Sequence, residues 1–105
     1  MIQQVKSFEE YKKFITTPGK VVFVDFYATW CGPCKFISPE FEKLSTQYPD
    51  CLFIKVDVEE VEKASEENNV SNLPTFMAFK DGKKIDDMVG ADVENLRKFV
   101  AKNQA

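Results

Sequence analysis

Two cysteines separated by two residues, Cys31 and Cys34, are the side chains of this sequence best suited to chemistry. Such a pair supports either thiol–disulfide exchange or half of a tetrahedral zinc site, which needs four ligands. The sequence has no histidine and only one further cysteine, Cys51, so a complete Cys/His zinc site within the chain is impossible. Two inert buried thiols remain the other alternative. A position after a strand and at the start of a helix favours a redox dithiol.

That position follows from the apolar run of residues 21–27, which is typical of a central strand covered on both faces. The junction between such a strand and the next helix is where open α/β sheets form their sites. We expect Cys31 at the helix start, where unpaired backbone amides and the helix dipole favour a thiolate. Cys34, one turn further on, is then close enough to attack a disulfide made at Cys31, and Pro33 suits the first helical turn.

A reactive thiolate is not sufficient for fast exchange. Lowering a thiol pKa from about 8.5 to about 7 raises the thiolate fraction at pH 7 roughly sixteen-fold, but roughly five-fold is lost again as nucleophilicity. The rest of the rate must come from holding the target disulfide in line and from the second thiol nearby. The mechanism therefore requires a surface that binds the substrate, and Trp30, next to Cys31, is a candidate for that surface rather than for ordinary packing.

Two charged residues interrupt the predicted strands, Asp25 in residues 21–27 and Lys55 in residues 52–56. An aspartate is almost never fully buried unless it is paired, and burial raises its pKa toward neutrality. Because the chain has no histidine, Asp25 is the candidate to take the proton of Cys34. The alternative is a structural carboxylate hydrogen-bonded at the strand end, and the pattern alone also allows Lys55 to be a solvated strand-end lysine.

Periodicity and turn signals predict the order β-α-β-α-β-α-β-β-α. Early strands separated by helices must run parallel, whereas the last two form an antiparallel hairpin about Asp81-Gly82, so the sheet is mixed and flanked by helices. Phe36, Phe41 and the other phenylalanines are expected in the core. The predicted strands are 2–5, 21–27, 52–58, 75–80 and 84–89, and the predicted helices are 8–15, 34–48, 59–68 and 93–100.

The bulk composition is that of an ordinary globular protein, and 105 residues give room for a single domain, residues 1–105. A net charge of −3 argues against nucleic acid or anionic lipid as the main partner. We find no apolar stretch typical of a secretory signal or of a membrane span, and Cys51 is interpreted as a small buried hydrophobic residue. These features predict a cytoplasmic protein that uses thiols for chemistry and has no nucleic-acid or membrane partner.

Residues 24–35, VDFYATWCGPCK, are similar to the active-site signature of the thioredoxin family. The resemblance implies the thioredoxin fold, an α/β architecture with a mixed five-stranded central sheet flanked by four helices. Tyr27 and the lack of a longer amino-terminal segment make the sequence most similar to eukaryotic cytosolic members. Agreement with the family covers nearly the whole chain and includes residues 55–57, 73–75, 81–82 and 89–91.

The resemblance also implies a division of roles within a protein-disulfide reductase. Cys31 attacks and Cys34 resolves, Asp25 assists Cys34, and Lys55 is the partner of the buried aspartate. The Gly-Pro pair between the cysteines is the version found in reductants, whereas oxidants and isomerases of the family usually carry a histidine there. No bound cofactor is needed.

Substrate binding is implied at a second group of residues. Although only about 5–6% of X–Pro bonds are cis, the resemblance makes Pro74 the cis-proline of the family. The backbone of Leu73 is then expected to pair with an extended segment of the substrate. A flat apolar platform is completed by Trp30, Gly32, Pro33, Gly90 and Ala91.

The implied partners are an NADPH-dependent flavoprotein thioredoxin reductase, which regenerates the dithiol, and client proteins with disulfides. Peroxiredoxins, methionine sulfoxide reductases and ribonucleotide reductase are the expected clients. Two rival functions remain at this point. One is an oxidase or isomerase of the same fold, and the other is a non-enzymatic adaptor or subunit.

Overall fold

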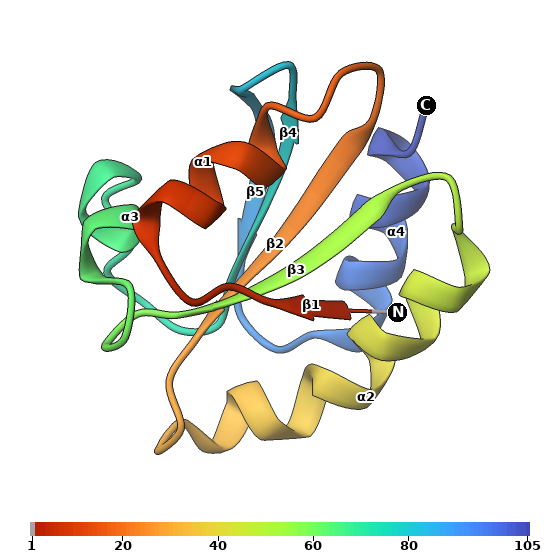
Figure 1. The fold of residues 1–105 in the computed structure, drawn as a ribbon. Coiled ribbons are helices and arrows are strands. Elements are labelled where there is room, and N and C mark those ends of the chain that lie inside the picture. The colour runs from red at the N-terminus through yellow and green to blue at the C-terminus, as the bar shows by residue number, and fades with distance from the viewer. Residues whose placement is uncertain (1) are drawn as a thin grey trace.

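Within residues 2–105, which a computed structural model describes, the chain forms five strands and four helices in the predicted order (Figure 1). No helix in this range is both long enough and apolar enough to cross a membrane. The elements are β1 (Ile2–Gln4), α1 (Phe8–Ile15), β2 (Val21–Tyr27), α2 (Gly32–Gln47), β3 (Leu52–Asp57), α3 (Glu62–Glu67), β4 (Thr75–Lys80), β5 (Lys83–Val89) and α4 (Val93–Asn103).

The strands form one mixed sheet in the order β1-β3-β2-β4-β5, which confirms the predicted α/β class. β1 and β2 run parallel to β3, while β4 runs antiparallel to β2 and to β5. β2 is therefore the central strand. Its Asp25 is paired in register with Lys55 of β3 on one side and with Phe76 of β4 on the other.

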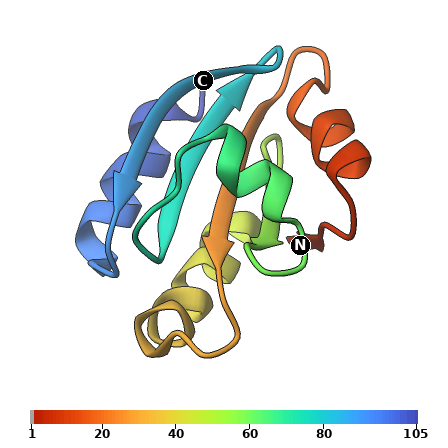
Figure 2. The same ribbon diagram turned by 90° about the vertical axis from the view of Figure 1, so that its left-hand side faces the viewer.

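Helices cover both faces of the sheet, α1 and α3 on one and α2 and α4 on the other (Figures 1 and 2). Each face has its own hydrophobic core. Val24 of β2 packs with Tyr11 of α1 in the first core, and Phe23 packs with Phe41 of α2 and Phe99 of α4 in the second. Neighbouring residues of β2 thus serve opposite cores, as the period of two in a strand requires.

The same alternation places four polar or amphipathic side chains on the α2 face. Asp25 and Tyr27 follow Phe23 at steps of two along β2, so they point to the side of Phe23. Lys55 has the same relation to Phe53, a member of the α2 core, and Gln4 is the register partner of Lys55. Asp25 and Lys55, the two charged residues that interrupt the apolar strands, therefore lie on the same face of the sheet, under α2.

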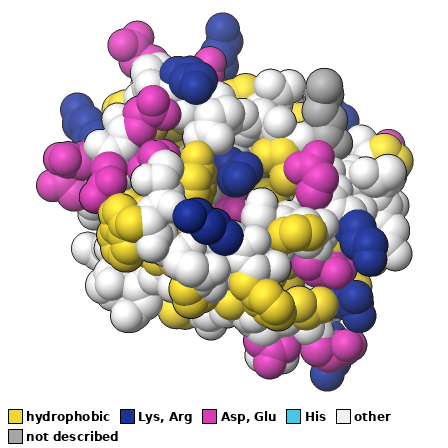
Figure 3. Space-filling view, turned by 90° about the horizontal axis from the view of Figure 1, so that it is seen from below, with side chains coloured by type: hydrophobic (Ala, Val, Ile, Leu, Met, Phe, Trp, Pro, Cys, Tyr) yellow, Lys and Arg dark blue, Asp and Glu magenta, His cyan; other side chains and the backbone are white. Residues whose placement is uncertain are grey.

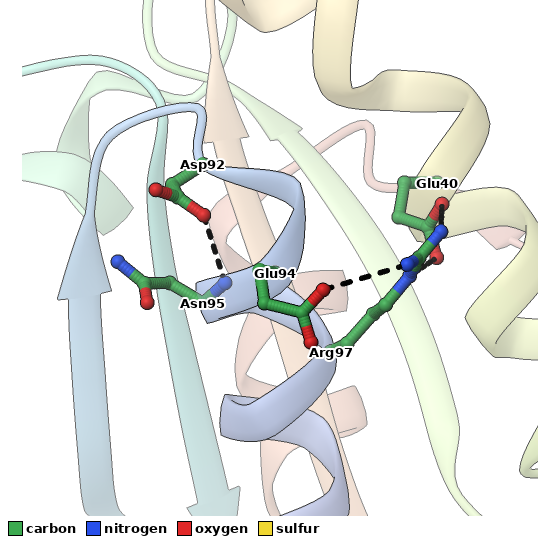
Figure 4. Close-up of polar contacts among 5 residues, drawn as sticks. All are labelled: Glu40, Asp92, Glu94, Asn95 and Arg97. Atoms are coloured by element: carbon green, nitrogen blue, oxygen red, sulfur yellow. Dashed lines mark hydrogen bonds and ion pairs between the residues drawn. The ribbon is translucent and has the colours of Figure 1, made fainter.

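α2 and α4 are joined by an ion pair (Figure 4). The Arg97 guanidinium of α4 donates from Nε to Glu40 Oε2 at 3.0 Å and from its second terminal nitrogen to Glu40 Oε1 at 3.2 Å. This two-bonded geometry is the one that best matches a planar guanidinium to a carboxylate. Asp92 caps the start of α4 by accepting a hydrogen bond from the amide of Asn95 at 3.0 Å. The contact between the two helices is thus fixed in position along α2.

α3 is shorter than predicted, since it begins at Glu62 and not at residue 59. The carboxylate of Asp57 accepts hydrogen bonds from the amides of Glu59 at 2.9 Å and of Glu60 at 3.4 Å. These bonds hold the chain in a turn at the end of β3. A side-chain acceptor two residues upstream competes in this way with helix formation.

The prediction that Phe36 belongs to the core is wrong, because this side chain is 67% exposed. The buried face of α2 carries Ile37, Phe41 and Leu44, as the periodicity predicted. Phe36 precedes Ile37 by one residue and is therefore turned about 100° around the helix, toward solvent.

Replacing Phe36 by serine is accordingly expected to change the free energy of unfolding by no more than about 0.5 kcal/mol, as for other surface positions. Urea denaturation followed by circular dichroism measures this difference. A loss of several kcal/mol would mean that the ring is packed in solution.

Candidate active site

Cys31 and Cys34 form a disulfide between the carboxyl end of β2 and the first turn of α2. Their Cα atoms are 5.3 Å apart, within the usual range for a disulfide. Cys31 is the N-cap residue of α2, and its Sγ accepts a hydrogen bond from the amide of Cys34 at 3.1 Å. Because this amide is part of the helix start, it is placed to stabilise a thiolate on Cys31 once the disulfide opens.

Both cysteines are nearly covered, with exposed fractions of 5% for Cys31 and 4% for Cys34. Exposure therefore does not distinguish their roles. Sequence reasoning assigned Leu73 to this neighbourhood but missed the rest of the packing. The side chains that pack on the small cluster of Ala28 and the two cysteines are Tyr27, Val58 and Leu73.

A cavity of about 230 Å³ leads from the surface to one of the two cysteines. Cys34, Asp25 and Lys55 line it together, whereas Cys31 does not. The remaining lining residues come from the end of β2, the loop after it and the first two turns of α2: Tyr27, Ala28, Thr29, Lys35 and Ser38. The structure thus brings the predicted proton acceptor and the predicted resolving thiol to one cavity.

The surface at this end of the molecule is of mixed character. Figure 3 is seen from below Figure 1, the side on which α2 lies, and shows hydrophobic side chains interspersed with lysine, arginine and acidic groups. Trp30, one of the apolar groups near the cysteines, is 66% exposed. An exposed large apolar side chain beside a reactive disulfide is typical of a contact surface.

Asp25 is the most deeply placed charged group of the site, with 1% of its surface exposed. Within residues 2–105 its Oδ1 has no hydrogen-bond partner. Burial raises the pKa of Asp25 to about 7, and the positive charge of Lys55 offsets this rise in part. The alternative interpretation of the sequence was a structural carboxylate that is hydrogen-bonded at the strand end, and Oδ1 does not fit it. Near neutral pH the group is able to accept and release a proton.

Lys55 lies close to Asp25 in the sheet but does not pair with it directly. Its Nζ is 4.6 Å from the centre of the Tyr27 ring, a cation–π contact. The hydroxyl of Tyr27 in turn donates to Gln4 Oε1 at 3.0 Å. Lys55 therefore acts on Asp25 through space. The alternative of a purely solvated lysine leaves out its contact with the Tyr27 ring.

The orientation of Trp30 depends on a residue that sequence reasoning missed. The indole Nε1 donates to Glu59 Oε2 at 3.0 Å, and Glu59 is itself held by the turn that Asp57 caps. Glu59 lies 29 positions after Trp30 and in a segment predicted as helix, so no local signal in the sequence identifies this contact.

The loops before β4 and after β5 meet at a backbone hydrogen bond. The Leu73–Pro74 peptide bond is cis, which confirms what the family resemblance implied. The amide of Gly90 donates to the carbonyl of Pro74 at 2.9 Å. Gly90 has φ +109°, a conformation that side-chain-bearing residues rarely adopt, and a Cβ built on it or on Gly32 meets no atom within 4 Å. The backbone is therefore open to a partner at both glycines.

Cys51 is distant from this chemistry. The thiol is 8% exposed and donates to the carbonyl of Gln104 with 3.4 Å between Sγ and oxygen. Burial raises the pKa of Cys51, which keeps it in the unreactive thiol form. Its predicted role as a small buried hydrophobic residue is confirmed.

The two cysteines form a disulfide between a helix N-cap and the first helical turn. Such a disulfide takes up two electrons on reduction, and the resulting dithiol releases them by exchange with another disulfide. Fold and site together define a dithiol–disulfide oxidoreductase.

Comparisons with known proteins agree with this class. The model of the Thioredoxin family matches residues 2–102. A thioredoxin of Coprinus comatus is 45% identical over 100% of both chains. Among solved structures, the thioredoxin of Plasmodium falciparum superposes with a TM-score of 0.92 at 40% identity and covers 95% of this chain and 97% of its own. The chain belongs to the thioredoxin family, and it is a protein-disulfide reductase.

A further solved chain comes from a study of the thiol-resolving mechanism in yeast mitochondrial 1-Cys peroxiredoxin via glutathione/thioredoxin systems. It superposes with a TM-score of 0.89 at 37% identity and covers 96% of this chain and 94% of its own.

Proposed function

We propose that Cys31 is the nucleophile and Cys34 the resolving thiol when this protein reduces a client disulfide. One observation carries the assignment: Cys31 Sγ accepts the helix-start amide, while Cys34, and not Cys31, shares a cavity with Asp25. The first cysteine is thus placed to be a stabilised thiolate. The second is placed to lose its proton to a carboxylate whose pKa is about 7.

In the proposed reaction the Cys31 thiolate attacks one sulfur of the client disulfide, and the other client sulfur leaves as a thiolate that takes a proton from water. Cys34 then gives its proton to Asp25 and attacks Cys31 Sγ. The mixed disulfide breaks, the second client thiolate leaves, and the Cys31–Cys34 disulfide forms. Two electrons have passed to the client, and the product is the oxidised form described above.

We further propose that the client binds the surface around Cys31. Support comes from the exposed and oriented Trp30, from the open backbone at Gly32 and Gly90, and from the hydrogen bond that joins Gly90 to Pro74. An extended client segment is proposed to pair with the backbone at Leu73, in the manner of strand addition. Pro33 and Ala91 complete this surface, which we call the docking platform: Trp30, Gly32, Pro33, Leu73, Pro74, Gly90 and Ala91.

The proposed electron donor is an NADPH-dependent thioredoxin reductase, and the proposed clients include peroxiredoxins, methionine sulfoxide reductases and ribonucleotide reductase. The structural similarity to a chain studied with a peroxiredoxin supports the first of these clients. A cytoplasmic location is proposed because the chain keeps Cys51 as a free thiol, which suits a reducing compartment. Residues 1–105 are proposed to form one domain, and the single sheet shared by both cores supports this.

The test is reduction of a disulfide protein in an assay coupled to NADPH through a thioredoxin reductase, with the wild-type chain and with Trp30→Ala. Turnover is expected to require both the chain and the reductase. For Trp30→Ala we expect kcat/KM toward the protein client to fall about ten-fold, as when an aromatic interface anchor is truncated.

A small linear disulfide makes few contacts with the protein surface. Its reduction is therefore expected to change less than about two-fold in Trp30→Ala. Glu59→Gln, which keeps an oxygen acceptor for the indole, is the matched control and should stay close to wild type. Equal losses on the large and the small substrate would rule out the docking platform as the site of client binding.

A further inference from the structure

Tyr27 and three other side chains form a chain of contacts across adjacent strands on the α2 face. Gln4 of β1 and Asp25 of β2 are both register partners of Lys55, so Lys55 lies between them in the sheet. Tyr27 is two residues beyond Asp25 on the same side of β2. The ammonium of Lys55 therefore has two possible partners nearby, the carboxylate of Asp25 and the ring face of Tyr27.

The structure places the ammonium at the ring. Lys55 Nζ is 4.6 Å from the centre of the Tyr27 ring, while no hydrogen bond or ion pair joins Lys55 to Asp25 among residues 2–105. The ring itself is fixed, because the Tyr27 hydroxyl donates to Gln4 Oε1 at 3.0 Å. Asp25 Oδ1 is left without a hydrogen-bond partner within residues 2–105.

We propose that Tyr27 is a positioning residue for the reaction: its ring holds the Lys55 ammonium over its face and so keeps it from pairing directly with Asp25. The proposal deepens the proposed function, since it rests on Asp25 as the acceptor of the Cys34 proton. An ammonium in contact with a carboxylate strongly favours the charged carboxylate and makes it a weaker base. Held at the ring, Lys55 moderates the charge of Asp25 without neutralising it.

The other groups around Asp25 and Tyr27 do not replace this function. Cys34 and Lys35 of α2 line the same cavity, and Lys55 is the charge from β3 that acts on Asp25. Burial raises the pKa of Tyr27, and the negative charges of Asp57, Asp25 and Glu60 add to the rise. The phenol therefore stays protonated near neutral pH and keeps its hydrogen bond to Gln4.

The test is a titration of the Asp25 carboxyl carbon by nuclear magnetic resonance in the oxidised protein. Removing the ring in Tyr27→Leu frees Lys55 to pair with Asp25, and we expect the carboxyl pKa to fall by about one pH unit, the low end for an opposite charge brought into contact. Tyr27→Thr, a second variant without a ring, is expected to shift it in the same direction. Tyr27→Phe keeps the ring and is the matched control, with a shift less than half as large.

The role of Lys55 is tested in the double variant Tyr27→Leu, Lys55→Gln. Its Asp25 pKa is expected to match that of Lys55→Gln alone, because the ring acts only through the lysine. The proposal is overturned if the ringless variants leave the Asp25 pKa unchanged or raise it, or if the downward shift persists without Lys55. Circular dichroism and thermal unfolding establish that each variant is folded.

The rate at which Cys34 resolves a mixed disulfide, measured as a function of pH, separates this proposal from the proposed function. When the Asp25 pKa falls in Tyr27→Leu, the pH profile of resolution is expected to move with it. A lower Asp25 pKa with an unchanged profile supports the positioning by Tyr27 and refutes Asp25 as the acceptor of the proton.

Discussion

Replacing Cys31 by serine is expected to abolish turnover, so that NADPH-coupled reduction of a disulfide protein falls to the rate measured without the chain. The serine hydroxyl does not ionise near neutral pH, and the remaining Cys34 lies within the first turn of α2 and lines the cavity of Asp25, so it lacks the N-cap position that favours a thiolate. No other thiol can substitute, because Cys51 is buried and its pKa is raised.

Cys34→Ser is the matched variant and is expected to fail differently. Its Cys31 still attacks, but no resolving thiol follows, so one client molecule stays bound through a mixed disulfide. Non-reducing electrophoresis and intact-mass measurement detect this adduct, which dithiothreitol should release. If Cys31→Ser trapped the client and Cys34→Ser did not, the two assigned roles would be reversed.

Asp25→Asn is expected to stabilise the protein at alkaline pH by roughly 4 kcal/mol, the value that follows from a carboxyl pKa of about 7 in the folded chain against an ordinary value of 3.8. Between these two values the folded state keeps a proton that the unfolded state has lost. The wild type therefore loses stability as the pH rises from about 4 to about 7, and the loss is complete above pH 7.

Urea denaturation of the oxidised proteins from pH 4 to pH 8.5 measures this difference. Wild type and Asp25→Asn are expected to have similar stability near pH 4 and to diverge as the pH rises, with the asparagine variant more stable. The same variant should resolve mixed disulfides more slowly at neutral pH, because it has no carboxylate to take the Cys34 proton. A constant difference in stability across this pH range would show that Asp25 does not titrate as described.

The sequence alone predicted the features of the fold that depend on local pattern. Apolar runs and turn signals located all five strands, and the predicted parallel pairing of the early strands and the final antiparallel hairpin are both observed. The order of the strands in the sheet was not predicted. Two errors have different causes. Asp57 accepts hydrogen bonds from two amides and delays the start of α3, which the helical pattern alone did not indicate. Phe36 was assigned to the core from its residue type, whereas the helical period places it beside the buried face that contains Ile37.

For the site, the sequence predicted the residues whose type conflicts with their surroundings. Asp25 in an apolar strand is such a residue, and it is indeed buried with a raised pKa. Glu59 and Tyr27 carry no comparable signal. The contact of Glu59 with Trp30 joins two loops, and that of Tyr27 with Lys55 joins two strands, so both depend on the path of the chain in space.

The ion pair between Arg97 and Glu40 has a mechanical consequence for the disulfide. α2 is anchored to α4 by this pair and to the sheet by its buried face, which includes Ile37 and Phe41. Cys34 belongs to the anchored helix, whereas Cys31 is the last residue of the loop before it. The disulfide thus links a helix that is held at two places to the loop after β2. We expect the resolving thiol to keep its place when the disulfide opens, because the contacts that hold α2 do not depend on that bond.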